Sequence, residues 1–173
     1  AEATDLPIMI YNNRVAYKVD LTPESFVELS DVDNIIAVKE SSHDSRRITD
    51  MYNACKDRYQ MFCGVDDLVL ENVLFGAQGW VSGLVNSFPK ESVRLFELAR
   101  EGRVDEALEI YRWFMPLLHL DVDVKLVQMI KLANQIAGEG SEWVRRPRLT
   151  LEGEERRMVT ELVETAIANR PNL

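Results

Sequence analysis

The feature that most constrains the fold is a fourfold alternation of short apolar runs with amphipathic segments of helical spacing. This order is typical of βα units arranged around a parallel sheet. Thr22 and Pro23 are typical of a helix start, as N-cap and first helical residue, and Asp66 or Asp67 can cap a later helix. The sequence predicts strands at 7–11, 35–39, 59–63 and 79–83, with helices from 22, at about 45–56, after 66–67, and from 87–89 to about 102.

After residue 104 the sequence pattern changes from alternating strand and helix signals to helix signals alone, so no further strand is expected. Helical spacing of apolar residues recurs at about 104–119, 123–138 and 151–169. The predicted organisation is therefore a βα part at 1–102 followed by a helical extension at 103–173.

Four βα units leave a parallel sheet incomplete, because such a sheet is stable only when both faces are covered and its edges are protected. Two interpretations are open. One is a small open α/β domain. The other is the second half, strands five to eight, of an eight-stranded (β/α)₈ barrel, a TIM barrel, whose first four strands lie outside the chain. The start at Ala1, without an initiator Met, favours a fragment.

Composition disfavours several classes of partner. The chain has 20 Lys and Arg against 29 Asp and Glu, so its net charge of −9 repels nucleic-acid phosphates. The uncharged stretch 72–89 contains glycines and polar residues that a lipid-spanning helix does not tolerate, and no secretory signal is recognised. Cys55 and Cys63 form no disulfide framework. We expect a reduced, cytoplasmic protein that binds neither nucleic acid nor membrane.

Lys39 is the first candidate for chemistry. It ends the apolar run 35–38 and precedes the polar run 40–44, so it is expected at the carboxyl end of a strand. Active sites of α/β barrels lie at that edge, where a partly desolvated amine can attack a carbonyl or imine carbon. The commoner role of such a lysine is to extend into solvent, and the local pattern by itself favours that role.

Tyr11 ends the first strand in the same way, so its hydroxyl is expected at the same edge as the amine of Lys39. A phenol there can shuttle protons while a carbinolamine and an imine form. Considered by itself, Tyr11 is better explained as a half-buried aromatic residue with its hydroxyl at the rim.

The acidic cluster of Asp66, Asp67 and Glu71 is better explained by helix capping than by a metal site. The only histidines, His43 and His119, do not combine with the cysteines in a zinc-ligand spacing. No metal site is therefore predicted.

The motifs together resemble the second half of the dihydrodipicolinate synthase and N-acetylneuraminate lyase family, over essentially the whole chain. They are Tyr11-Asn12-Asn13, Ala37-Val38-Lys39-Glu40-Ser41-Ser42, Gly64-Val65-Asp66-Asp67, and Gly79-Trp80-Val81-Ser82-Gly83 with Asn86. The resemblance implies a (β/α)₈ barrel in which Lys39 forms a Schiff base and Tyr11 shuttles the proton. It also implies substrate contacts from the Ser41 hydroxyl and from the chain at Gly64, Val81 and Gly83.

The resemblance further implies that no metal or organic cofactor is needed, because a lysine iminium is itself an electron sink. The implied partners are a 2-oxo acid or a cyclic imine carboxylate, the first half of the barrel, and identical subunits in a homotetramer. The family loop that receives the substrate carboxylate belongs to the first half. We therefore expect residues 1–173 by themselves to be inactive.

Three positions depart from the family pattern. Arg14 replaces a usual Pro, His43 replaces a usual Gly, and Ala16 stands where the synthase branch has an Arg for a substrate carboxylate. Ala16 argues against lysine biosynthesis, and Gly83, in place of a hydroxyl residue, argues against neuraminate cleavage. Whether Arg14 takes over carboxylate binding is left open.

The closer resemblance is to the 1-pyrroline-4-hydroxy-2-carboxylate deaminases of hydroxyproline degradation. It rests on segments 17–20, 111–121 and 125–128. It implies conversion of the cyclic imine to 2-oxoglutarate semialdehyde and ammonia. The alternatives are a dihydrodipicolinate synthase-like enzyme, a 2-keto-3-deoxy sugar acid aldolase or dehydratase, and a non-catalytic relative with a binding role.

Overall fold

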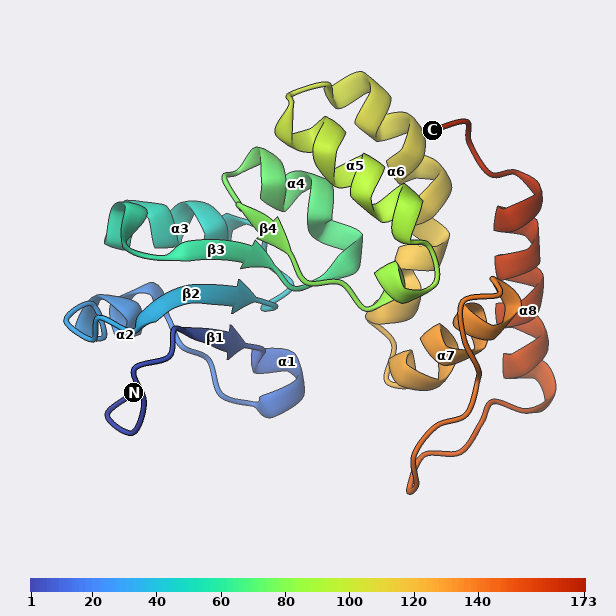
Figure 1. Cartoon of the computed structure of the whole chain (residues 1–173), viewed down its shortest axis with the longest axis horizontal. Coiled ribbons are helices and arrows are strands. Elements are labelled where there is room, and N and C mark those ends of the chain that lie inside the picture. Colours follow the sequence, from blue (N-terminus) through green and yellow to red (C-terminus); the bar gives the residue numbers. More distant parts are fainter. The chain divides into compact units, whose positions relative to one another are not determined.

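Apolar runs at the expected places form a parallel sheet in the computed structural model, which describes residues 1–173 (Figure 1). All neighbouring strands are parallel and the strand order follows the sequence. The last strand is shorter than the predicted 79–83, because only Phe62 and Cys63 pair with it. The strands are β1 (Ile8–Asn12), β2 (Ile35–Glu40), β3 (Gln60–Cys63) and β4 (Gly79–Trp80).

The pairing of β1 with β2 contains a register shift. Ile8 lies opposite Ile35, whereas Met9 lies opposite Ala37, so Ile36 is passed over. Beyond the shift Tyr11 lies opposite Lys39. Side chains alternate between the faces of a strand, so an unshifted register would have placed Tyr11 opposite a residue of the other face.

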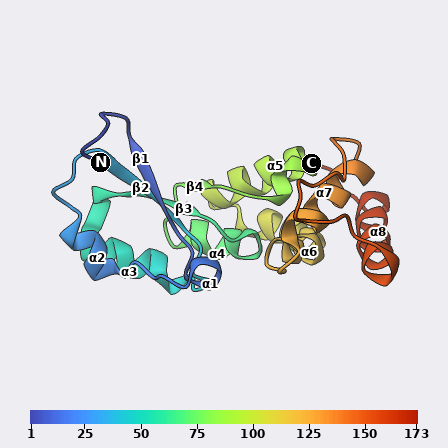
Figure 2. The same ribbon diagram turned by 90° about the horizontal axis from the view of Figure 1, so that it is seen from below.

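Helices of the first unit lie along one side of this sheet (Figure 2). Val38, Met61 and Cys63 are buried, whereas Met9 and Tyr11 of the opposite face are exposed. A one-turn helix after β1, absent from the prediction, forms where the side chain of Asn13 caps the backbone. The elements are α1 (Arg14–Tyr17), α2 (Pro23–Glu28), α3 (Arg46–Cys55), η1 (Lys56–Arg58), η2 (Asp66–Leu68) and α4 (Val69–Leu74).

The helix starts confirm one capping prediction and correct another. Thr22 is the N-cap of α2 and Pro23 its first residue. The expectation that Asp66 or Asp67 caps the helix after β3 is wrong, because Leu68 is the N-cap of α4 and both aspartates lie in the preceding 3₁₀ turn. Asp66 is fully buried and accepts a hydrogen bond of 3.0 Å from the indole of Trp80.

Residues 82–173 form a second compact unit that contains helices and no strand, and the prediction of no strand after residue 104 is confirmed. Phe88 and Phe114 are fully buried, with ring centroids 5.8 Å apart, and the Trp113 indole donates to the carbonyl of Ala166 on the last helix. None of the helices is long and apolar enough to cross a lipid bilayer. The elements are η3 (Leu84–Asn86), α5 (Pro89–Arg100), α6 (Val104–Leu118), η4 (His119–Asp121), α7 (Leu126–Ile136) and α8 (Gly153–Ala168).

The compact units are Ala1–Val81 and Ser82–Leu173. Helix α5, which the predicted boundary at 102/103 assigns to the βα part, belongs to the helical unit and packs on α6. The compact units are defined by contacts within the chain, so the domain boundary at 102/103 stays a prediction.

Arg58 ties the turn between α2 and β2 to the fold. Its guanidinium donates to the carbonyls of Ser30, Val32 and Ile35 at 2.8, 2.8 and 2.9 Å, and its charge lies 4.7 Å from the centroid of the Tyr59 ring. Ile35 is the first residue of β2, so the same side chain fixes where the strand of Lys39 begins.

We expect Arg58→Ala to lower the free energy of unfolding by about 2–3 kcal/mol, because three carbonyls lose a charged donor. Urea unfolding measures this change. The matched control is Arg46→Ala, which removes the same charge from a side chain that is 84% exposed, and it should cost less than about 0.5 kcal/mol. Equal losses in the two variants would contradict the structural role of Arg58.

Candidate active site

Lys39 and Tyr11 meet at the carboxyl end of the sheet. They are register partners on β2 and β1, so their side chains share one face of the sheet. The Nζ atom of Lys39 is 4.1 Å from the centroid of the Tyr11 ring. The structure therefore brings together the two residues that the sequence analysis proposed as nucleophile and proton shuttle.

Gly64 and Ser41 lie directly beside Lys39. A Cβ atom on Gly64 would overlap the Ser41 hydroxyl and come within 2.8 Å of the Lys39 Cε atom. Glycine is thus required by close approach, because any side chain here would displace the lysine or the serine. Ser41 is 1% exposed, and its hydroxyl has no hydrogen-bond partner in the structure. A buried hydroxyl without a partner marks a place where a ligand can bind.

The predicted contacts at Val81 and Gly83 fall in different compact units. Val81 ends the first unit, where its backbone N–H donates to the carbonyl of Cys63 at 2.9 Å. Gly83 belongs to the second unit, and a Cβ atom there would come within 2.5 Å of Asp121 Oδ1 and 2.8 Å of Ile130 Cδ1. Gly83 therefore has a packing role in its own unit.

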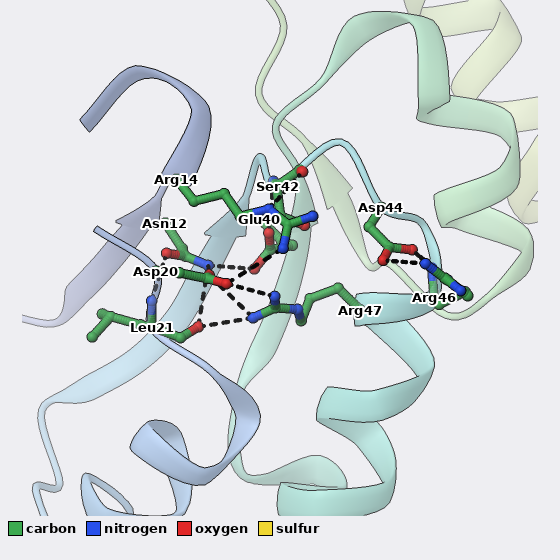
Figure 3. A network of polar contacts seen from close by, with 9 residues as sticks. All are labelled: Asn12, Arg14, Asp20, Leu21, Glu40, Ser42, Asp44, Arg46 and Arg47. Carbon is green, nitrogen blue, oxygen red and sulfur yellow. Dashed lines mark hydrogen bonds and ion pairs between the residues drawn. The ribbon is translucent and has the colours of Figure 1, made fainter. Parts of the chain in front are cut away.

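The residues that follow Tyr11 and Lys39 hold each other across the two strands. The side-chain amide of Asn12 donates to Glu40 Oε2 at 3.0 Å, and the other oxygen of Glu40 accepts from the backbone N–H of Ser42 at 2.7 Å. Asn12 and Glu40 are 2% and 3% exposed. Figure 3 shows this pair at the centre of a polar network that reaches the neighbouring loop and α3.

Asp20 and Arg47 extend the network. Arg47 of α3 donates to both oxygens of Asp20, at 3.2 and 2.9 Å, and to the carbonyl of Leu21 at 3.0 Å (Figure 3). The same amide of Asn12 also donates to Asp20 and Leu21. The hydrogen bond from Arg47 is the main cause that lowers the pKa of Asp20, against the opposing effect of burial. The network therefore closes the loop between α1 and α2 onto the strand ends.

Arg14 is part of this network. Its Nε donates to the carbonyl of Ser42 at 3.2 Å, and its Nη1 lies 3.6 Å from Asp20. His43, the neighbour of Ser42, has a backbone φ of 62°, in the left-handed region that favours glycine. Two of the three departures from the family pattern, Arg14 and His43, thus lie in one pair of neighbouring loops.

Sequence reasoning did not single out Asn12, Asp20, Glu40 or Arg47 as site residues. Asn12 and Glu40 had one usable signal, since each directly follows a candidate residue at a strand end. Asp20 stood only within segment 17–20, which supported a resemblance and not a site, and Arg47 had no signal, because one helix arginine predicts nothing until the fold brings it to its partner. Side chains of His, Cys, Asp and Glu nowhere gather in a set of three that could hold a metal ion.

A family model and curated relatives of similar sequence point to one family. The family model described as the dihydrodipicolinate synthetase family matches residues 1–166. A 4-hydroxy-tetrahydrodipicolinate synthase 2 of Halalkalibacterium halodurans is 30% identical, over 95% of this chain and 56% of its own length. A 4-hydroxy-tetrahydrodipicolinate synthase of Chlorobium limicola is 31% identical, with the same two shares.

Solved structures agree with the fold. The dihydrodipicolinate synthase of Aquifex aeolicus matches with a TM-score of 0.88 and 26% identity, over 95% of this chain and 56% of that chain. YagE, a prophage protein of E. coli K12 solved in complex with pyruvate, matches with a TM-score of 0.87 and 26% identity, over 96% of this chain and 58% of that one. The chain thus spans little more than half the length of the proteins it resembles.

The Asp20–Arg47 pair predicts how stability depends on pH. A carboxyl whose pKa is lowered by folding stabilises the protein above its unfolded pKa, about 4, and this contribution is lost as the pH falls below that value through the lower folded pKa. We expect Asp20→Asn to lower the free energy of unfolding by about 2 kcal/mol at pH 7. In this variant the free energy of unfolding should also decline less steeply as the pH falls, which urea unfolding at several pH values measures. Asp50→Asn, on the exposed side of α3, is the control and should keep the wild-type slope. An unchanged slope in Asp20→Asn would contradict the role of the pair.

Proposed function

The chain belongs to the dihydrodipicolinate synthetase family, and from this premise we propose that it supplies the amine and phenol of a Schiff-base-forming enzyme. The observation that carries the proposal is the position of the Lys39 amine, 4.1 Å from the centroid of the Tyr11 ring at the carboxyl edge of the sheet. The proposed substrate is a small 2-oxo acid or a cyclic imine carboxylate. YagE, solved with pyruvate, supports a 2-oxo acid as ligand.

The proposed chemistry uses both groups with a 2-oxo acid. The neutral amine of Lys39 adds to the carbonyl carbon, and the resulting carbinolamine loses its hydroxyl as water with a proton from Tyr11. The phenolate then removes a proton from the adjacent carbon, which gives a neutral enamine and restores the phenol. We propose that the Ser41 hydroxyl, which has no hydrogen-bond partner in the structure, and the chain at Gly64 and Val81 contact the substrate.

For the reaction itself we propose deamination of 1-pyrroline-4-hydroxy-2-carboxylate. Ala16 supports it, because the synthase branch requires a carboxylate-binding Arg there, and so do segments 17–20, 111–121 and 125–128. Lys39 would attack the imine carbon, open the ring and support loss of the 4-hydroxyl through an enamine. Hydrolysis would release 2-oxoglutarate semialdehyde and ammonia, with the net consumption of one water.

A second candidate is 4-hydroxy-tetrahydrodipicolinate synthase activity, which the names of the curated relatives favour. In the synthase branch an Arg holds a substrate carboxylate, and Ala16 stands at that position here. Another group would therefore have to bind the carboxylate. Arg14 is near in sequence, but its guanidinium already contacts Ser42 and Asp20. The remaining alternatives are a 2-keto-3-deoxy sugar acid aldolase or dehydratase and a non-catalytic relative.

We propose that a further set of βα units completes a (β/α)₈ barrel around this sheet. The chain spans 56% of its curated relatives, and both edge strands lack a second neighbour. The strand-free residues 104–173 support assignment of β1–β4 to the last four barrel strands, because a first half would continue to a fifth strand. Assembly as a homotetramer and a cytoplasmic location stay proposals.

The test of the Schiff base is intact mass after incubation of the complete barrel protein with pyruvate and borohydride. Only an imine is reduced to a stable adduct, so we expect a mass increase that maps to Lys39 and is absent in Lys39→Ala. Product analysis with the hydroxylated pyrroline carboxylate, with pyruvate plus aspartate semialdehyde, and with deoxy sugar acids then separates the candidate reactions. Absence of an adduct with every oxo acid and cyclic imine would leave the non-catalytic relative as the better account.

A second prediction concerns residues 1–173 by themselves. Met9 and Tyr11 of edge strand β1 are exposed, and open parallel edges favour association between chains. We expect the purified chain to aggregate or to show no turnover until the remaining βα units are supplied in trans. Size-exclusion chromatography combined with the trapping assay measures both properties, and an active monomer would contradict the proposal.

A further inference from the structure

Asn13 contacts the reactive atom of Tyr11. Its Nδ2 donates to the Tyr11 hydroxyl oxygen at 3.0 Å, while its Oδ1 accepts from the backbone N–H of Ala16 at 2.9 Å. The two halves of one amide therefore serve two functions. One half caps the short helix α1, and the other reaches the phenol.

The cap fixes the orientation of this amide. The backbone N–H of Ala16 can only donate, so it must face the oxygen of the Asn13 side chain. The NH₂ group is then left to face Tyr11. Consequently the phenol oxygen is the acceptor in this contact, and its own proton is free to point elsewhere.

The ring of Tyr11 is held from two further sides. The ring of Tyr17, at the end of α1, meets it edge to face with centroids 5.7 Å apart, and the amine of Lys39 lies over its face. The helix that Asn13 caps thus also supplies the residue that packs against the phenol. These contacts restrict the ring while leaving its hydroxyl bound by a single donor, Asn13.

We infer that Asn13 is a positioning residue that directs the proton of Tyr11 towards the substrate, an inference that rests on the proposed function. With an N–H already on the phenol oxygen, the phenol proton points away from Asn13 and is available to the departing hydroxyl of the carbinolamine. When that proton has left with water, the same N–H donates to the phenolate oxygen. The phenolate recovers a proton from the carbon next to the iminium, and the contact returns to its starting state.

The decisive variant is Asn13→Asp. Aspartate is as good an N-cap as asparagine, so the helix keeps its cap. Its carboxylate accepts from the phenol where the amide donated, so it binds the proton that the reaction needs. Asn13→Ala loses both functions and serves as the second variant. Asn53→Asp, on the exposed side of α3, makes the same change of charge and should leave the rate unchanged.

The measurement is the rate of the Lys39 adduct with pyruvate in the complete barrel protein, followed by quenching with borohydride at successive times. For Asn13→Asp we expect a rate at saturating pyruvate about 10-fold lower, with the half-saturating concentration within about 2-fold of the wild type and an unchanged urea midpoint. In a Tyr11→Phe background the same substitution should have less than about a 2-fold effect, because its target is gone.

The outcomes separate this inference from the proposed function. An adduct in the wild type with an unchanged rate in Asn13→Asp would overturn the role of Asn13 and leave the Schiff-base proposal intact. An equally large effect in the Tyr11→Phe background would overturn it as well, because Asn13 would then not act through the phenol. A wild type that forms no adduct at Lys39 would overturn both proposals.

Discussion

The register shift between β1 and β2 is the constraint on which the candidate site depends. Passing over Ile36 moves every later residue of β2 by one position relative to β1. On one face of the sheet the shift places Tyr11 opposite Lys39, and on the other it places Asn12 opposite Glu40. A reactive pair and a hydrogen-bonded pair are thus set by the same irregularity, because alternate side chains of a strand point to opposite faces.

The buried network makes this arrangement rigid without using the reactive groups. Asp20, Glu40 and Arg47 carry charges whose burial is costly unless each finds partners, and here each oxygen of the two carboxylates accepts a hydrogen bond. The network joins the loop that follows Tyr11 to the loop that follows Lys39 (Figure 3). The Lys39 amine and the Tyr11 phenol stay outside it, with the phenol held by Asn13.

Much of the fold could be predicted because its signals are local. Apolar runs and helix starts such as Thr22-Pro23 gave the strands and helices to within a few residues, and the unbroken helical spacing after residue 104 predicted a strand-free unit. The capping expectation for Asp66 failed because a buried indole, distant in sequence, provides its partner. Helix α1 was missed because a single turn is too short for a periodic pattern, and only the side chain of Asn13 defines its start.

The sequence by itself determined that Tyr11 and Lys39 end neighbouring strand-forming runs, and its motifs indicated the family that the comparisons then showed. Only the tertiary structure decided that the two side chains share a face, that Gly64 is needed for close approach, and that Asn13 reaches the phenol. The physical reason is the range of the forces involved. Propensity and periodicity act over a few residues, whereas register, close packing and hydrogen bonding of buried groups depend on which distant segments become neighbours.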